Sequence, residues 1–440
     1  MQRLFVFAIL LLLTLAAGCS LLNNSPAAPG STPTPELIIT PTNTPDPIIT
    51  PDLALSAPLT KTKASLTIWL PPEIWGATES GQAVFNAQMN AYRASNPDLD
   101  VNVESKSVSG QGSILNYLRT GRTVAPAVLP DLVALPTEQL STAVSEDLIF
   151  PLNTHLDTAL IEDLYPAGQS LVLNEEQILG YPFALNNLPH LAYDSTQLTN
   201  SVPITWAGFI QLPEQHFVFP AAGQEGATLA LELYLAAGGA IVNEAGQQEL
   251  QLEPLVTALQ QISVGRENGF ILSESSNIHM LEDSWLLLQT GQTSFVQTSA
   301  NQYLRQQNPE NVLNMIAIPG LERPLIPLVT GWAWAISASD SNKQTQAADL
   351  LAFLVAGENL GEWSYQSNYL PARQTAFNFW PTELPFIPFA QSQLLIAEAH
   401  PFPTNNAIMN ALSNAVFDVV SLAKSPQVAA EEALTSLQEQ

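Results

Sequence analysis

The chain has 440 residues, 46% of them hydrophobic, and carries 13 Lys and Arg against 40 Asp and Glu, which gives a formal net charge of −27. This length and apolar content allow one large two-lobed body or two to three ordinary domains. The excess of acidic residues argues against binding to nucleic-acid phosphates, because such binding depends on clustered cations.

The N-terminus has the pattern of a secretory signal peptide. Arg3 supplies a positive charge, and residues 4–17 form an apolar run that contains a single Thr. A run of this length is too short to span about 30 Å of hydrocarbon comfortably as a helix. Small residues follow it, so we predict a signal peptide over residues 1–18.

Cys19 is the only cysteine of the chain. A lone cysteine is most often a buried thiol, and it can also be a nucleophile or half of an intermolecular disulfide. The segment LAAGC at 15–19 resembles the bacterial lipobox, in which a peptidase cuts before the cysteine and the thiol carries diacylglycerol. The resemblance implies a lipid anchor at Cys19 on the outer face of the cytoplasmic membrane. An uncleaved anchor or ordinary secretion is the alternative.

Residues 19–64 differ in composition from the rest of the chain. They are rich in Pro, Thr, Ser and Asn, with near-repeats such as PELIITPTNTPDPIITPD. Frequent proline removes backbone donors and favours extended conformations, so this stretch cannot form a packed core. We predict a disordered linker that holds a folded body away from the membrane.

Order is predicted to begin at Ser65, with a β-α-β unit. Residues 66–70 are strand-like, 80–96 have apolar residues at helical spacing, and 101–104 alternate like a strand. Such alternation predicts an α/β fold with a mainly parallel sheet covered on both faces. Further helical patterns lie at 114–118, 227–237, 255–262, 344–355 and 405–422, and further strand-like runs at 128–135, 293–297, 312–318 and 332–336.

The sequence has no motif of a cofactor-dependent or hydrolytic enzyme. It contains no nucleotide-binding glycine loop and no serine elbow with a histidine partner, and its five His have no zinc-site spacing. We therefore expect a protein that is not an enzyme, with no catalytic residues, no cofactor and no metal.

Several short segments occur in an order that is typical of one family. LTIW at 66–69 looks like its first strand, PDLVAL at 130–135 like its Pro-Asp strand, and GYPF at 180–183 like its crossover into a second lobe. Further landmarks are LAYD at 191–194, PITW at 203–206, GQTSF at 291–295, TGW at 330–332 and LPAR at 370–373. Together they resemble family 1 extracellular solute-binding proteins, the group that includes maltose-binding protein and many sugar receptors.

The resemblance implies a two-lobed, periplasmic-binding-protein-like α/β fold. Its first lobe would comprise residues 65–187 and 297–329, and its second lobe residues 188–296 and 330–440. Each lobe would be a sheet flanked by helices, with ligand held between the lobes. The resemblance further implies a secreted, monomeric receptor of an ABC importer, which closes by hinge motion and delivers its solute to membrane permease subunits.

Composition points to a carbohydrate as the ligand. Sugar sites need aromatic platforms for the C–H faces and amide or carboxylate groups for the hydroxyls. The chain has 8 Trp, 9 Tyr and few cations, which suits an oligosaccharide or another polyol better than an anion. The residues expected to bind ligand lie at the crossovers, in the loop after the first strand or around TGW; they are Trp75, Tyr181, Asn186, Asn187, Gln297, Thr298, Trp332 and Trp334. Asn405 and Asn406 are weaker candidates.

For each tryptophan, packing in the core is the competing interpretation. We expect Trp69 to be a core residue because it lies within a strand. The other tryptophans are also expected to serve in packing; they are Trp206, Trp285, Trp363 and Trp380.

Two other functions stay open. A sensor or assembly lipoprotein could keep this fold without a transport role. A glycoside hydrolase would need two carboxylates about 5 to 10 Å apart, and among 40 acidic residues some pair meets that distance by chance.

Overall fold

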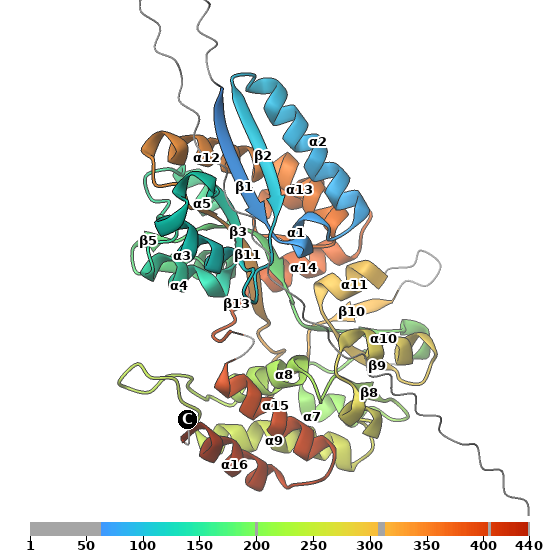
Figure 1. Ribbon diagram of the computed structural model, residues 1–440. Helices are drawn as coiled ribbons and strands as arrows, with labels where there is room; N and C mark the ends of the chain where they lie inside the picture. The colour runs from blue at the N-terminus through green and yellow to red at the C-terminus, as the bar shows by residue number, and fades with distance from the viewer. Residues whose placement is uncertain (1–62, 199–200, 307–312, 404–405, 439–440) are drawn as a thin grey trace, which may run out of the picture. The chain divides into compact units, whose positions relative to one another are not determined.

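The β-α-β unit expected at the start of the folded region is present in the computed structural model (Figure 1). Strand β1 (Ala64–Leu70) pairs in parallel with β2 (Leu99–Ser105), and helix α2 (Glu79–Ser95) connects them. The helix begins after Thr78, whose hydroxyl oxygen accepts a hydrogen bond from the Gly81 N–H at 2.8 Å. This N-cap satisfies one of the backbone donors that a helix start leaves free.

The structure describes residues 63–198, 201–306, 313–403 and 406–438. The predicted signal peptide, Cys19 and nearly all of the predicted linker lie outside these ranges, so they stay predictions. Residues Lys61–Gln440 form one compact unit. Within the described ranges, none of the helices combines the length and the apolar character needed to cross a membrane.

The first sheet has seven strands in the order β12-β6-β11-β3-β1-β2, with β13 paired to β11. Strands β1, β2 and β3 pair in parallel, as do β11 and β13, whereas β11 is antiparallel to both β3 and β6, and β12 is antiparallel to β6. The expectation of a mainly parallel sheet is therefore wrong, since burial on both faces does not reveal strand direction. The remaining strands of this sheet are β3 (Leu132–Pro136), β6 (Tyr181–Asn186), β11 (Leu328–Ile336), β12 (Leu370–Pro371) and β13 (Glu398–Ala399).

The second sheet has four strands in the order β10-β7-β9-β8. Strand β7 is antiparallel to both of its neighbours, and β8 is parallel to β9. The strands are β7 (His190–Tyr193), β8 (Phe217–Val218), β9 (Phe295–Thr298) and β10 (Asn314–Ile316), and a separate two-stranded hairpin is formed by β4 (Leu173–Asn174) and β5 (Gln177–Ile178).

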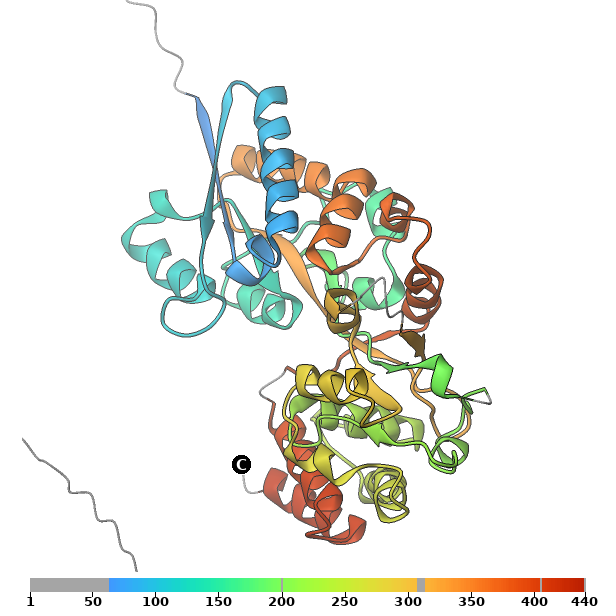
Figure 2. The same ribbon diagram turned by 90° about the vertical axis from the view of Figure 1, so that its right-hand side faces the viewer.

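Helices cover both sheets. One face of the first sheet packs against α2, α12 and α13, and the other face packs against α3 and α4 (Figure 2). Helices α8, α9, α15 and α16 pack on one another next to the second sheet. Besides α2, the helices are α1 (Pro72–Trp75), α3 (Ile114–Val124), α4 (Leu140–Ser145), α5 (Thr158–Glu162), α6 (Pro166–Ser170), α7 (Trp206–Phe209), α8 (Gln224–Ala236), α9 (Leu252–Glu267), α10 (Leu281–Gln289), α11 (Ala300–Gln306), α12 (Ser341–Leu354), α13 (Gly357–Ser367), α14 (Phe386–Leu394), α15 (Ala407–Val420) and α16 (Pro426–Gln438).

The division of the chain between the lobes differs from the expected one after residue 296. Residues 297–329 were expected in the first lobe, but β10 pairs with β7 of the second sheet. Residues 330–440 were expected in the second lobe, but β11 pairs with β3 and β6 of the first sheet. The segment at Gln297 and Thr298 is thus not a crossover. The chain passes between the sheets between β6 and β7, between β10 and β11, and after β13.

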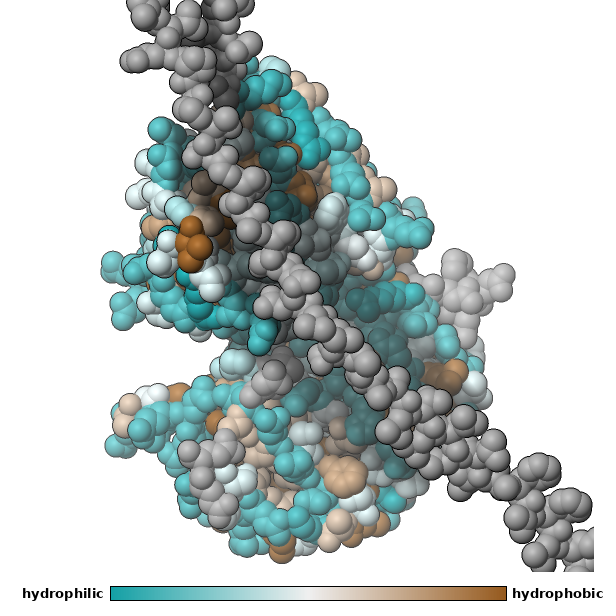
Figure 3. Space-filling model, viewed as in Figure 1, coloured by the Kyte–Doolittle hydropathy of each residue, from teal (hydrophilic) through white to brown (hydrophobic). Residues whose placement is uncertain are grey.

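Hydrophilic residues cover most of the face shown in Figure 3. The interior is apolar: one cluster of buried side chains includes Ile68, Phe183 and Trp334 of the first sheet, and another includes Trp206, Phe217 and helices α8, α9, α15 and α16 around the second.

Glu232 is a buried carboxyl group that joins α8 to the start of β11. Its side chain is 3% exposed, and its Oε1 accepts a hydrogen bond from the Leu328 N–H at 3.0 Å. The second carboxylate oxygen has no hydrogen-bond partner among the described residues. Burial raises the pKa of Glu232 to about 8, and the bond from Leu328 opposes this only in part.

We expect Glu232→Gln to remove a pH-dependent loss of stability. Because the folded pKa lies above the unfolded value, the stability linked to Glu232 is fully present below about pH 4.5 and is lost as the pH rises through about 8. Relative to wild type, the free energy of unfolding of the variant should therefore rise by about 3.5 kcal/mol between pH 5 and pH 8. Urea titrations at both pH values measure this difference. Glu253→Gln, at an exposed position, is the control, and an equal gain at both pH values would contradict the prediction.

Candidate functional site

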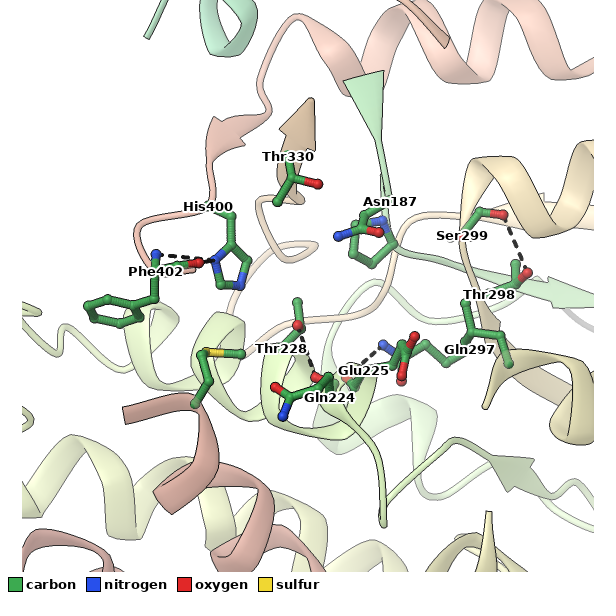
Figure 4. Close-up of a pocket in the computed structure, with 13 residues that line it drawn as sticks. Asn187, Gln224, Glu225, Thr228, Gln297, Thr298, Ser299, Thr330, His400 and Phe402 are labelled. Atoms are coloured by element: carbon green, nitrogen blue, oxygen red, sulfur yellow. Dashed lines mark hydrogen bonds between the residues drawn. The ribbon is translucent and has the colours of Figure 1, made fainter. Parts of the chain in front are cut away.

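A pocket lies where the chain passes between the two sheets (Figure 4). Its walls come from the segment after β6, from the start of α8, from the end of β9, from β11 and from the segment after β13. The lining residues are Asn187, Pro189, Gln224, Glu225, Thr228, Leu281, Gln297, Thr298, Ser299, Thr330, His400, Phe402 and Met409. Both sheets and the crossing segments therefore contribute to one site.

The first turn of α8 presents Gln224, Glu225 and Thr228 to the pocket. The helix begins after Gly223, which has an extended backbone. At Gly226 a Cβ atom would lie 2.6 Å from the carbonyl oxygen of Pro220, so only glycine allows the helix to start this close to the preceding loop. This close approach fixes the polar end of α8 at the pocket wall.

Residues of the first crossing have an unusual backbone. Asn187 and Leu188 have φ angles of 73° and 46°, a conformation that is unfavourable for residues other than glycine. Next to them, the ring of His190 is fully buried against Tyr303 and Phe389. Burial lowers the pKa of His190 to about 4, so this ring is uncharged at neutral pH. Backbone in a left-handed conformation thus precedes Pro189, and a buried ring follows it.

Several hydrogen-bond donors at the pocket wall are used inside the protein. Gln297 Nε2 donates to the Glu225 carbonyl oxygen at 3.1 Å, and the Thr228 hydroxyl donates to the Gln224 carbonyl oxygen at 3.1 Å. The Thr298 hydroxyl donates to the Ser299 carbonyl oxygen at 3.4 Å. Figure 4 shows these bonds as dashed lines. The two hydroxyl hydrogens and one of the two Nε2 hydrogens of Gln297 are therefore not free for a ligand.

Acceptor atoms at the pocket remain unused. The side-chain oxygens of Gln224 and Gln297 are buried and have no hydrogen-bond partner among the described residues. Gln297 is only 2% exposed, and an amide oxygen left unpaired at such a depth is unfavourable. A ligand that donates hydrogen bonds would satisfy both oxygens.

The charged groups of the pocket are carboxylates. Burial raises the pKa of Glu225, and repulsion from Glu282 raises it further, while the backbone N–H of Glu225 itself acts in the opposite direction. Burial lowers the pKa of His400, which keeps this imidazole neutral at neutral pH. None of the lining residues is Lys or Arg.

Three of the predicted ligand residues lie together at this pocket. Asn187, Gln297 and Thr298 all line it, although only Asn187 belongs to a crossing between the sheets. That they contact a ligand stays a prediction.

Two predicted site residues belong to the core instead. Tyr181 is fully buried, and its hydroxyl donates to the Leu160 carbonyl oxygen at 2.9 Å. Trp334 is 3% exposed and stacks on Phe183, with the ring centroids 4.9 Å apart. Because both rings are enclosed by protein atoms, we correct their assignment from ligand binding to packing.

The other three predicted residues lie outside the pocket lining. Trp332 is 8% exposed and packs in the core, Trp75 packs partly buried against the same core, and Asn186 is half-buried at the end of β6. The indole N–H of each tryptophan and the side-chain oxygen of Asn186 are buried without a partner among the described residues. The prediction that they bind ligand is not supported by the lining of this pocket.

The tryptophans expected to serve in packing do so. All five are at most 5% exposed; they are Trp69, Trp206, Trp285, Trp363 and Trp380. Asn405 lies outside the described residues, and the side chain of Asn406 caps α15 by accepting from the Ile408 N–H at 2.7 Å.

The sequence did not indicate most of the pocket wall. Missed residues come from α8, α10, β11, the segment after β13 and α15; they are Pro189, Gln224, Glu225, Thr228, Leu281, Ser299, Thr330, His400, Phe402 and Met409. The helical pattern at 227–237 located α8, but no local signal showed that its first turn faces a ligand. Within the described part of the chain, no cluster of His, Cys, Asp and Glu could hold a metal ion.

The sequence matches a known protein family. Residues 87–384 match the family described as bacterial extracellular solute-binding protein. A comparison with curated protein sequences gives no match.

Solved structures share the fold at low sequence identity. A cyclo/maltodextrin-binding protein complexed with maltotetraose superposes with a TM-score of 0.69 at 17% identity, covering 86% of this chain and 97% of the other. The cyclic alpha-maltosyl-1,6-maltose binding protein from Arthrobacter globiformis gives a TM-score of 0.67 at 16% identity, covering 86% and 98%. The maltose-binding periplasmic protein from Listeria monocytogenes in complex with maltose gives a TM-score of 0.67 at 15% identity, covering 86% and 97%. The expected two-lobed α/β fold is confirmed.

Proposed function

Because the chain belongs to the bacterial extracellular solute-binding proteins, we propose that it captures a carbohydrate in the pocket between its two sheets. The observation that supports this most is the set of unused acceptors at the pocket, since the hydroxyl groups of a sugar would donate to them. The absence of Lys and Arg from the lining opposes phosphate, sulfate and dicarboxylates as ligands. The similar structures also include proteins solved with maltose and maltotetraose.

We propose further that the two lobes close on the sugar by hinge motion and that an ABC permease then receives it. Ligand shifts such an equilibrium only through contacts that are better in the closed form. Solution scattering should show a smaller radius of gyration with bound ligand. Loss of uptake of that sugar on deletion of the gene supports transport, whereas unchanged uptake favours the alternative of a sensor or assembly lipoprotein.

A thermal-shift panel of oligosaccharides, amino acids, phosphate, sulfate and polyamines tests the ligand class. A ligand at 100 times its dissociation constant should stabilise the native state by about 2.7 kcal/mol. We expect oligosaccharides to raise the melting temperature. If only amino acids or anions do so, the carbohydrate proposal is wrong. Release of hydrolysis products from a bound oligosaccharide would instead indicate an enzyme.

Gln297→Leu should weaken binding of the oligosaccharide found by the panel by about tenfold to a hundredfold. The substitution removes a buried amide oxygen that would accept a ligand hydroxyl, and loss of one such bond lowers affinity by about 1–3 kcal/mol. Calorimetry measures the dissociation constant. Gln292→Leu, at an exposed position before β9, should bind like wild type. Equal affinity of wild type and Gln297→Leu would place the sugar elsewhere.

Lipidation at Cys19 is also part of the proposal. We expect Cys19→Ser to release the protein from the membrane fraction, because a thiol is needed to carry the diacylglycerol. Mass spectrometry of the wild-type membrane fraction should find a mature chain that starts at a lipid-modified Cys19. An intact Met1 terminus or an unmodified thiol would contradict this prediction.

A further inference from the structure

Glu225 is a carboxylate at the pocket without a cation beside it. Among the described residues no Lys, Arg or His forms an ion pair with it, and Gln297 donates to its backbone carbonyl rather than to its carboxylate. Nearby Glu282 repels it. A partly buried carboxylate with a like charge near it is stabilised by any positive group that enters the site.

The helix starts at the pocket offset only part of this negative charge. Glu225 lies in the first turn of α8, and Glu282 lies in the first turn of α10. A helix N-terminus carries about half a positive charge, so each helix start offsets only part of the charge of its own carboxylate. Negative charge at Glu225 therefore remains for a ligand to neutralise.

The unused acceptors surround this charge. The side-chain oxygens of Gln224 and Gln297 lack partners, and both residues line the same wall of the pocket as Glu225 (Figure 4). On this wall, one hydrogen of Gln297 Nε2 and the hydroxyl hydrogen of Thr228 are already donated to backbone carbonyls. An ammonium group has three donors and one positive charge, and it has no acceptor that would need a donor here.

We infer that the ligand is an amine-bearing sugar, whose protonated amino group binds at Glu225 and donates to the amide oxygens of Gln224 and Gln297. The inference rests on the proposed carbohydrate function and makes Glu225 a specificity-determining residue. A neutral sugar would fill the same pocket but leave the charge of Glu225 unpaired.

Calorimetry with matched trisaccharides tests this inference. The probes are the trimer of glucosamine, its N-acetylated form and maltotriose, at pH 6, where the amine of glucosamine is protonated. We expect the glucosamine trimer to bind at least about tenfold more tightly than either neutral trimer, by analogy with other partly desolvated charge pairs, and to lose affinity as salt is added. Glu225→Gln should abolish this preference, so that the glucosamine trimer binds the variant no more tightly than the neutral trimers do.

Glu253→Gln is the matched control, because Glu253 also lies in the first turn of a helix of the second lobe but is exposed. It should keep the preference, and melting curves of both variants should show folded protein. If the neutral trimers bind as tightly as the glucosamine trimer, or if Glu225→Gln keeps the preference, the inference is wrong and the carbohydrate proposal stands. If no trisaccharide binds, even if spermidine does bind, both the inference and the carbohydrate proposal are wrong.

Discussion

Trp334→Ala should lower the free energy of unfolding by about 3–5 kcal/mol and leave ligand affinity within twofold of wild type. Trp334 is almost fully buried in the middle of β11 and stacks on Phe183 of the neighbouring strand. Truncation removes that contact and leaves a cavity in a core that rigid strands and helices surround. Urea unfolding followed by circular dichroism measures the loss.

Trp334→Phe is the matched control for this prediction. A phenyl ring keeps part of the stacking and fills much of the space, so its loss of stability should be clearly smaller than that of the alanine variant. A stable Trp334→Ala protein that has lost its ligand would show that the first interpretation, a tryptophan of the binding site, was right after all.

Arg373→Met should lower the free energy of unfolding by about 3–5 kcal/mol. Arg373 Nε lies 2.7 Å from Asp163 Oδ2, and the two side chains are 12% and 13% exposed. The guanidinium also donates to the Val355 carbonyl oxygen, and Thr375 donates to Asp163 through its backbone and its hydroxyl. Removing the arginine leaves Asp163 largely buried without its cation.

A double-mutant cycle separates the contribution of the ion pair between Arg373 and Asp163 from the loss of packing that each substitution causes. Asp163→Leu combined with Arg373→Met should be more stable than Arg373→Met alone, because no uncompensated charge remains. The surface pair Arg119 and Glu146 provides a comparison, since both side chains are more than a third exposed and the loss of this pair should change stability far less than the loss of Arg373. An equally small effect of Arg373→Met would contradict the prediction.

Local periodicity was enough to find most elements. The expected strands at 66–70, 101–104 and 128–135 correspond to β1, β2 and the region of β3, and the expected helix at 344–355 corresponds to α12. These elements bury an apolar face that repeats with the period of a strand or helix, and this signal lies within a short window of sequence. Their existence was therefore predictable.

The sheet that each strand joins was less predictable from the sequence. Strand β11 is apolar at nearly every position because both of its faces are buried, so its sequence does not indicate which neighbours it pairs with or in which direction. The resemblance implied that TGW at 330–332 lies at a crossing between the lobes. Strand β11 does begin near such a crossing, but it then continues into the first sheet. Pairing over such a distance depends on tertiary contacts that no short window contains.

The same reasoning explains the mixed result for the site. Asn187, Gln297 and Thr298 were chosen as polar residues at the expected crossovers. They lie at or directly after the ends of β6 and β9, and strand ends are where ligands meet α/β sheets. Trp332 and Trp334 were chosen for their aromatic rings, but they lie on a strand face that helices cover. The contribution of α8 was not visible, because its polar first turn resembles any solvated helix start.

The place of β11 between β3 and β6 also determines when the first lobe can be completed. Residues 332–336 pair with 132–136, about two hundred positions earlier in the chain, and helices α12 and α13 that cover this sheet come later still. Contacts so distant in sequence form slowly, because a long loop must close before they contribute. Until β11 emerges, β3 and β6 lack their shared neighbour and leave unpaired edges open to aggregation. The first sheet can therefore close only after the chain has been extended past residue 336.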